Sequence, residues 1–321
     1  MRYLSLAAGM VGMVMAGSPA VAGEIAIAMH VEPGNTMFKV AERMKATIEA
    51  ESGGSHTVVL LGQEVGGESD QIEATSTGEY QIVLGGSVPM SVYAPEYAAA
   101  DLPFVWTSSA EAAAVYEGDR GDQIQAKLAE NGNLHLIGLS ARNPRNLTSN
   151  KPVTTPADLE GARIRVPQIS TWIRIWSELG ALPSPIAWPE VYTSLQTGVI
   201  EMQENPVDNI HSGKLYEVQS HVDRTQHVYS FYHWLANNEW LNGLSEEDRT
   251  MVQSAADEAL AWGDKQTASG EASVAAELTA KGMTFVDVDT AAFRTKAEPA
   301  IREIAATYAP DVRDYVLSKL K

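Results

Sequence analysis

The chain has 321 residues, a net charge of −18 at pH 7 and no cysteine. The missing cysteines exclude disulfides, thiolate metal sites and a cysteine nucleophile. The strong negative charge argues against nucleic acid and anionic membrane surfaces as partners. The length is sufficient for two domains.

Residues 1–22 have the pattern of a signal peptide. Arg2 precedes an apolar run over 4–16 that is too short to span a membrane. Ala20-Val21-Ala22 matches a cleavage site, so Gly23 is expected to begin an exported mature chain. We find no later apolar run of the roughly 18 residues that a membrane span requires. A bacterial periplasm is the simplest destination.

Strands and helices alternate in the first half of the mature chain. We expect strands at 24–30, 56–61, 80–84 and 134–139, and helices at 37–51, 70–77 and 109–131. This β-α-β order predicts the α/β class. Gly85-Gly86-Ser87 follows a strand without the spacing of a P-loop or a G-x-G-x-x-G motif. Such a turn either presents backbone amides to an anion or forms an ordinary tight loop.

The stretch from Ala141 to Asn209 holds the densest group of basic side chains. They are Arg142, Arg145, Lys151, Arg163, Arg165 and Arg174. Arg165 alternates with Ile164 and Val166 on a short strand that Pro167 stops. A guanidinium held near a strand end can grip a carboxylate with two parallel hydrogen bonds. The tetrapeptide alone also fits a surface arginine in an ion pair.

Repeating units predict a second small α/β domain in the rest of the chain. We expect strands at 163–166, 184–187, 199–203 and 284–288, and helices at 170–179 and 188–196. A further buried strand, expected at 228–235, returns to the first domain. The longest helix is expected from Ser245 to Lys281, about 55 Å at 1.5 Å per residue, and would run along both domains. Gly263 and Gly270 are the points where it can bend. Residues 290–321 are expected to be helical, with a break at Pro310.

Several sequence blocks follow one another in a specific order. They are LGQEVGG (61–67), APEYAAADLPFVW (94–106), RNLTSNKPVTTPADLEGARIRVP (145–167), WPEVYTSLQTG (188–198), EMQENP (201–206), and KLYEVQSHV with TQH (214–227). Together they resemble the DctP family, the substrate-binding proteins of tripartite ATP-independent periplasmic (TRAP) transporters. The resemblance covers nearly all of the mature chain.

The resemblance implies a two-domain periplasmic binding protein, or clam-shell, with a long helix spanning both domains. Residues 23–144 plus 229–265 are expected to form ligand-binding domain I, and residues 145–228 plus 266–321 ligand-binding domain II. It implies capture of a small organic acid, such as a sugar acid or hydroxy acid, in the interdomain cleft. The acid is then delivered to the membrane subunits of a TRAP transporter. No cofactor is expected, and a monomer is the default.

The resemblance also assigns ligand-binding residues. The arginine of the I-R-V-P strand clamps the ligand carboxylate in this family, and that residue is Arg165 here. The remaining candidates are Arg145 as a second anion contact, Asn205, Trp188 packing on the ligand, His30, Ser87, Gln168, and Glu64 or Gln63.

Other functions stay open on the sequence alone. Gly86 stands where some sugar-acid binders carry an acidic residue, which argues against a sialic-acid-like ligand. Trp172, Trp176 and Trp188 around the clamp favour a flatter or more apolar acid, although the first two, four residues apart on one helix, fit the core better. An aromatic or keto acid stays an alternative ligand. A ligand-binding protein of a sensor system would share the fold. An exported enzyme lacks support, because the chain contains no H-E-x-x-H or G-x-S-x-G motif.

Overall fold

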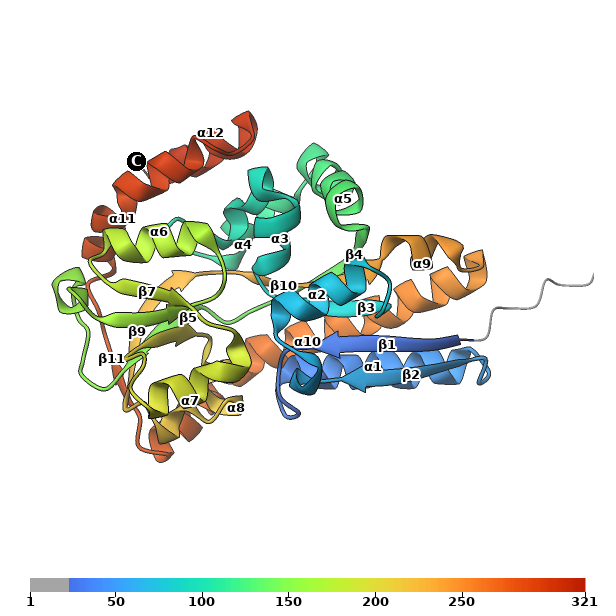
Figure 1. Ribbon diagram of the computed structural model, residues 1–321, viewed down its shortest axis with the longest axis horizontal. Helices are drawn as coiled ribbons and strands as arrows, with labels where there is room; N and C mark the ends of the chain where they lie inside the picture. Colours follow the sequence, from blue (N-terminus) through green and yellow to red (C-terminus); the bar gives the residue numbers. More distant parts are fainter. Residues whose placement is uncertain (1–22, 321) are drawn as a thin grey trace, which may run out of the picture.

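The computed structural model describes residues 23–320 and divides into two lobes (Figure 1). The first lobe is built on a five-stranded sheet of order β2-β1-β3-β10-β4. The first three strands in the sequence are parallel, and β10 is antiparallel to both β3 and β4. The strands are β1 (Gly23–Met29), β2 (His56–Leu61), β3 (Ile82–Gly85), β4 (Leu134–Ala141) and β10 (Phe231–Asn237). The helices between and after them are α1 (Thr36–Glu51), α2 (Glu68–Ser76), α3 (Val88–Tyr93), α4 (Ser109–Ala113), α5 (Asp119–Gly132) and α9 (Asn238–Gly243).

The second lobe is built on a four-stranded sheet of order β11-β9-β5-β8. Its strands are β5 (Arg145–Ser149), β8 (Gln203–Asn205), β9 (His221–Val228) and β11 (Thr284–Val286). The parallel pair β6 (Arg163–Val166) and β7 (Leu182–Pro185) extends it. The backbone N–H of Arg165 donates to Met202 O at 2.9 Å and so holds β6 beside β8. The helices are α6 (Ser170–Glu178), α7 (Val191–Gln196) and α8 (Val207–Ser212).

Two chain segments connect the sheets side by side. Residues 142–144 lead from β4 into β5, and residues 229–230 lead from β9 into β10. The backbone N–H of Arg142 donates to Ser230 O at 3.2 Å, so the two connections are bonded to each other. A few residues at the ends of such strands can absorb the dihedral changes of a hinge motion.

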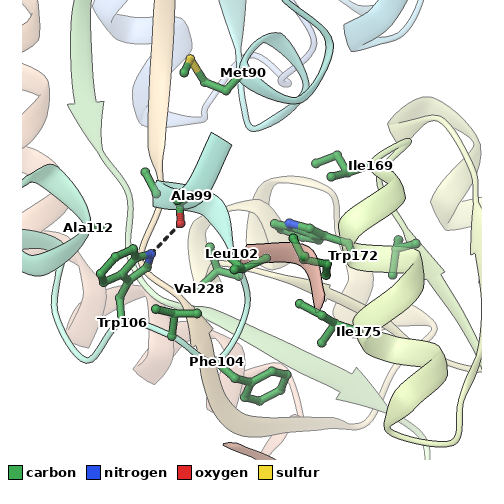
Figure 2. Packing of buried hydrophobic residues seen from close by; sticks show 14 of the residues in the cluster. Met90, Ala99, Leu102, Phe104, Trp106, Ala112, Ile169, Trp172, Ile175 and Val228 are labelled. Carbon is green, nitrogen blue, oxygen red and sulfur yellow. Dashed lines mark hydrogen bonds between the residues drawn. The ribbon is translucent and has the colours of Figure 1, made fainter. Parts of the chain in front are cut away.

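The α/β class and the two-lobed architecture are confirmed. The predicted division into 23–144 plus 229–265 and 145–228 plus 266–321 stays a prediction, because one apolar cluster runs through both parts. Figure 2 shows this cluster, with Leu102 beside Trp172 of α6. The indole N–H of Trp172 donates to Asp101 O at 2.9 Å. Trp172 and Trp176 are both fully buried, and neither lines the cleft cavities described below, so both belong to the core.

The long helix α10 (Glu246–Ala280) has 35 residues, which corresponds to about 52 Å. It begins at Ser245, whose side chain caps the N–H of Asp248 at 3.0 Å. It packs on α1 and β4 of the first lobe and on α8 of the second, and Figure 1 shows it running behind both. The helix passes through Gly263 and Gly270 without interruption. The predicted bridging helix is therefore confirmed.

The two glycines of α10 lie in different surroundings, which makes a matched stability test. A Cβ at Gly263 would lie 2.5 Å from Val40 Cγ2 of α1, whereas a Cβ at Gly270 would meet nothing within 4 Å. We expect Gly263→Ala to destabilise the protein by about 1–3 kcal/mol through overpacking. Gly270→Ala should instead stabilise it by up to about 1 kcal/mol, the helix propensity of alanine over glycine. Urea unfolding measures both, and equal effects of the two substitutions would refute the packing argument.

Several sequence-based boundaries are wrong. The helix expected over 109–131 is divided, because Gly118 has a φ of 60° and separates α4 from α5. Strands β5 and β9 were not predicted, and β7 and β8 are displaced from the expected ranges. The break predicted at Pro310 is confirmed, because residues 306–309 separate α11 (Thr290–Ala305) from α12 (Pro310–Ser318). Both terminal helices belong to the apolar cluster that also holds α6.

Candidate functional site

A small cavity of about 30 Å³ lies between the two lobes. The first lobe contributes residues that follow the carboxyl ends of its strands, and the second contributes β6, β8 and α8. The lining residues are His30, Glu68, Ser87, Arg142, Arg145, Arg165, Pro167, Trp188, Asn205 and Asn209. A neighbouring cavity shares Glu68, Arg165, Pro167 and Trp188 and is completed by other residues, including Gln168.

Arg165 is a buried cation that has no acidic partner in the described part of the chain. Its neighbours Ile164 and Val166 point into the core, and its own side chain, 5 % exposed, lines the cavity. Nε donates to Ile186 O at 2.7 Å, and the guanidinium carbon lies 5.9 Å from the centre of the Trp188 ring. Among residues 23–320 no carboxylate lies within 4.0 Å of this guanidinium. Burial lowers the pKa of Arg165 to about 10, as expected of a desolvated cation that lacks a counterion.

Arg145 is held by a buried carboxylate. Its Nε donates to Glu204 Oε2 at 2.6 Å, and its Nη2 donates to Glu204 Oε1 at 2.8 Å. His227 Nε2 lies 2.9 Å from the same Glu204 Oε2. Although burial acts to raise it, the charges of Arg145 and His227 bring the pKa of Glu204 down to about 2. Arg145 therefore lines the cavity with most of its donors already occupied.

Two polar residues of the first lobe reach the cavity. His30 lies at the end of β1, and its Nδ1 donates to Leu84 O at 3.0 Å. Burial lowers the pKa of His30, so the neutral ring presents Nε2 as an acceptor. Ser87 follows β3, and its buried hydroxyl has no hydrogen-bond partner among the described residues. Both residues lie where the sequence prediction expects them.

Contacts of Trp188 and Gln168 connect the lobes across the cleft. Trp188 Nε1 donates to Glu32 Oε1 at 3.0 Å, and Ser212 Oγ donates to Glu32 Oε2 at 3.1 Å. Ser69 Oγ donates to Gln168 Oε1 at 2.7 Å. Glu32 and Ser69 belong to the first lobe, whereas the other three belong to the second. The structure thus shows a closed cleft.

The remaining predicted residues are placed differently. Asn205, at the end of β8, lines the cavity and donates from Nδ2 to Gln203 Oε1 at 2.7 Å. Glu64 is exposed, accepts the N–H of Gly62 at 2.7 Å and lines neither cleft cavity. The alternative Gln63 donates to His30 O and to Glu32 rather than into the cavity.

Three polar lining residues were not predicted as ligand contacts. Arg142 belongs to the basic group in the sequence, but nothing in its spacing distinguishes it from the exposed Arg163. Glu68 lies at the end of the glycine-rich segment 62–69, where the prediction chose Glu64 instead. Asn209, one turn into α8, accepts from Tyr232 Oη at 3.1 Å. Only the packing of the two lobes brings these three side chains together.

The described residues contain neither a candidate metal centre nor a candidate membrane-spanning helix. Within residues 23–320 no group of three or more His, Cys, Asp or Glu side chains is arranged to hold a metal ion. In the same range no helix is long and apolar enough to cross a bilayer. The signal peptide predicted at 1–22 lies outside the described residues.

Two lobes with a polar, cation-lined cavity between them define the class of bilobal solute-binding proteins. The family model DctP, bacterial extracellular solute-binding protein family 7, matches residues 27–307. The chain belongs to this family.

Individual relatives agree with this assignment. A solute-binding protein of Roseobacter denitrificans is 38% identical over 261 residues, covering 81% of this chain and 79% of that protein. The crystal structure of a TRAP periplasmic solute-binding protein of the same organism, with bound L-galactonate, superposes with a TM-score of 0.86 at 33% identity, covering 93% of this chain and 98% of the other. The ectoine-binding periplasmic protein of Halomonas elongata is 33% identical, covering 70% of this chain and 67% of that protein. These relatives are described as binding proteins.

Proposed function

We propose that this protein captures a small organic acid in the cleft between its lobes and delivers it to the membrane subunits of a TRAP transporter. The observation that carries the proposal is Arg165, a buried guanidinium in the cavity wall with no carboxylate within 4.0 Å among residues 23–320. A carboxylate that leaves water loses strong hydration and needs charged donors in return. The attraction between a bound carboxylate and Arg165 offsets the hydration energy that both charged groups lose when they are buried.

The other cavity residues complete the proposed site. Asn205 and Trp188 contact the ligand from the second lobe, while His30 and Ser87 contact it from the first. The hydrogen bonds between Arg145 and Glu204 fix the Arg145 side chain in the cavity wall. Its remaining N–H groups point to the ligand. Gln168 connects the lobes at the cavity edge, and Glu68 takes the place at the cavity that was assigned to Glu64. A ligand that contacts both lobes favours the closed form, because it binds that form better than the open one.

Relatives support an acid as the ligand. The Roseobacter structure contains L-galactonate, and a TRAP solute-binding protein of Bordetella, 29% identical with a TM-score of 0.85 over 91% of this chain and 98% of the other, contains density interpreted as pantoate. Both ligands are hydroxy acids. We therefore place a hydroxy acid or sugar acid ahead of an aromatic or keto acid.

A thermal-shift screen of organic acids on refolded, ligand-stripped protein tests the proposal. We expect at least one acid to raise the melting temperature of the wild type and to have no effect on Arg165→Ala. A screen in which neutral sugars stabilise the protein and acids do not would contradict it.

Export, transport and a monomeric state complete the proposal. The signal-peptide pattern at 1–22 directs the chain to the periplasm, and the family is an extracellular one. Neighbouring genes for one small and one large membrane subunit would support the transporter over a sensor system. Size-exclusion chromatography with light scattering should give the mass of a single chain, and a stable dimer would correct the monomer proposal.

Trp188 provides a signal of cleft closure. Because its indole N–H bonds Glu32 of the opposite lobe, opening the cleft exposes the ring to water. We expect ligand addition to change the tryptophan fluorescence of the wild type, and Trp188→Phe to lose most of that change. Trp240→Phe, which removes a tryptophan packed in the first-lobe core, is the control and should keep it. A full ligand-induced signal in Trp188→Phe would count against closure at this residue.

A further inference from the structure

Arg142 is a second buried cation in the cavity, and its surroundings keep its donors available. Its guanidinium lies 4.0 Å from the centre of the Tyr232 ring, so one face is covered by an aromatic surface. Nη2 reaches Asn209 Oδ1 at 3.4 Å, a long hydrogen bond, and the buried Nε has no partner among the described residues. A stacked guanidinium directs its remaining N–H groups outward in its own plane.

No carboxylate among the described residues forms a close ion pair with Arg142. The charge of Arg142 acts on the buried carboxyls of Asp101 and Asp208, whose pKa values are raised by burial and lowered again by this arginine. Neither of them, nor any other acid among residues 23–320, lies within 4.0 Å of the Arg142 guanidinium. The cavity therefore contains a cation whose hydrogen bonds are incomplete.

The carboxylate of Glu68 is a hydrogen-bond acceptor in the same cavity as the Arg142 donors. Its Oε1 accepts the N–H of Gly86 at 2.7 Å and that of Val88 at 3.2 Å, which fixes the carboxylate. Its Oε2 has only His30 Nε2 nearby in the described part of the chain, at 3.8 Å. Because His30 already donates through Nδ1 and burial keeps its ring neutral, Nε2 carries no proton for Glu68. Oε2 is thus an acceptor in the cavity that the described residues leave without a donor.

Gly86 separates these two groups. A Cβ at residue 86 would lie 3.2 Å from Arg142 Nη1 and 3.5 Å from Glu68 Oε2. Both groups therefore flank one point, although they are too far apart for a direct ion pair of 4.0 Å or less. A single oxygen placed between them, about 2.8 Å from each, would bridge the two groups. Any side chain at position 86 would project into that space.

We propose that Arg142 is a specificity-determining residue which, with Glu68 across Gly86, binds a hydroxyl group of the ligand. An alcohol is the group that satisfies both partners, because its oxygen accepts from Arg142 while its O–H donates to Glu68. A keto oxygen leaves Glu68 without a donor, and a methylene leaves both groups unpaired. The ligand is therefore a hydroxy acid whose carboxylate lies on Arg165. This inference rests on the proposed capture of acids in the same cleft.

The net charge of the cavity side chains is that expected for a ligand with a single negative charge. Glu204 neutralises Arg145, and Glu68 offsets one of the two remaining cations. One ligand carboxylate then balances the other cation. Some sugar-acid binders carry an acidic side chain at the position of Gly86. In this protein Glu68 brings a carboxylate to the same place, so the glycine no longer argues against a polyhydroxylated ligand.

Titration calorimetry on refolded, ligand-free protein tests the subsite with two matched pairs of acids. The pairs are L-galactonate with hexanoate, and pantoate with 3,3-dimethylbutanoate; each second acid lacks only the hydroxyl groups of the first. We expect the wild type to prefer at least one hydroxy acid over its partner by about 100-fold or more, since a site built to hydrogen-bond a hydroxyl rejects analogues that lack it. Arg142→Gln and Gly86→Ala should each reduce that preference about tenfold or more.

Arg294→Gln is the control. Its guanidinium donates to Val105 O outside the cleft cavity, and its removal should keep the wild-type preference. Equal binding of both members of each pair to the wild type, or an unchanged preference in both variants, would overturn the hydroxyl subsite while the capture of acids stands. No heat with any of the four acids would overturn the subsite and count against the proposed function as well.

Discussion

Arg165→Ala should abolish capture of the acid without unfolding the protein. Removing one partner of a buried, hydrogen-bonded charge pair typically costs about 2–5 kcal/mol of binding, which corresponds to roughly 30- to 5,000-fold in affinity. The ligand-free variant should be at least as stable as the wild type, because the substitution removes a buried cation that has no acidic partner among the described residues. Calorimetry with the acid found in the screen measures the first effect, and thermal unfolding measures the second.

Arg163 provides the matched control on the same strand. It begins β6, is exposed, and lies 3.4 Å from the exposed Glu201. Arg163→Ala should change ligand affinity less than about threefold, because surface ion pairs contribute little. Unchanged affinity in Arg165→Ala, or an equal loss in both variants, would show that position 165 does not bind the carboxylate.

The second large effect concerns stability. Arg145, Glu204 and His227 form a buried network in which the guanidinium makes two hydrogen bonds to one carboxylate. Glu204→Gln removes the only carboxylate within 4.0 Å of Arg145 among residues 23–320 and should cost about 3–5 kcal/mol of unfolding free energy. Urea unfolding measures the loss. Glu201→Gln, at the exposed pair with Arg163, should cost less than about 1 kcal/mol.

The same network predicts an acid dependence. The pKa of Glu204 is about 2 in the folded protein, against an ordinary value of 4.5. A depressed carboxyl pKa stabilises the folded state at pH values above the ordinary one. That contribution is lost as the pH falls from about 4.5 towards 2, so the wild type should lose stability in this window. Glu204→Gln should show a shallower decline there, and parallel curves for the two proteins would contradict the assignment.

The sequence predicts the clamp better than its surroundings. The alternation around Arg165, its proline stop and the neighbouring blocks suffice to place an arginine at a strand end, whereas its burial is known only from the structure. The partner of Arg145 cannot be found in this way, because it depends on the antiparallel register in which Leu147 pairs with Glu204. Strand β5 itself was not predicted. A short polar segment such as Arg145–Ser149 becomes a buried strand only through pairing with β8 and β9.

The choice between Glu64 and Glu68 shows a second limit of sequence reasoning. Both residues follow strand β2 within a glycine-rich segment, and no pattern separates them. Glu68 begins α2 and reaches the backbone amides of Gly86 and Val88, which is a tertiary contact. The lack of a side chain at Gly86 likewise matters only because Arg142 and Glu68 lie next to it in the folded protein. Residues that act through packing between the lobes are therefore the ones that the sequence leaves unassigned.

The position of a bound carboxylate relative to Arg165 is the most direct test of the proposed site. A crystal structure with the acid selected by the thermal-shift screen would measure it. We expect the carboxylate oxygens about 2.7–2.9 Å from the Arg165 guanidinium nitrogens, with the rest of the ligand between Arg142 and Glu68. A bound acid whose carboxylate lies away from Arg165 would contradict the proposed site.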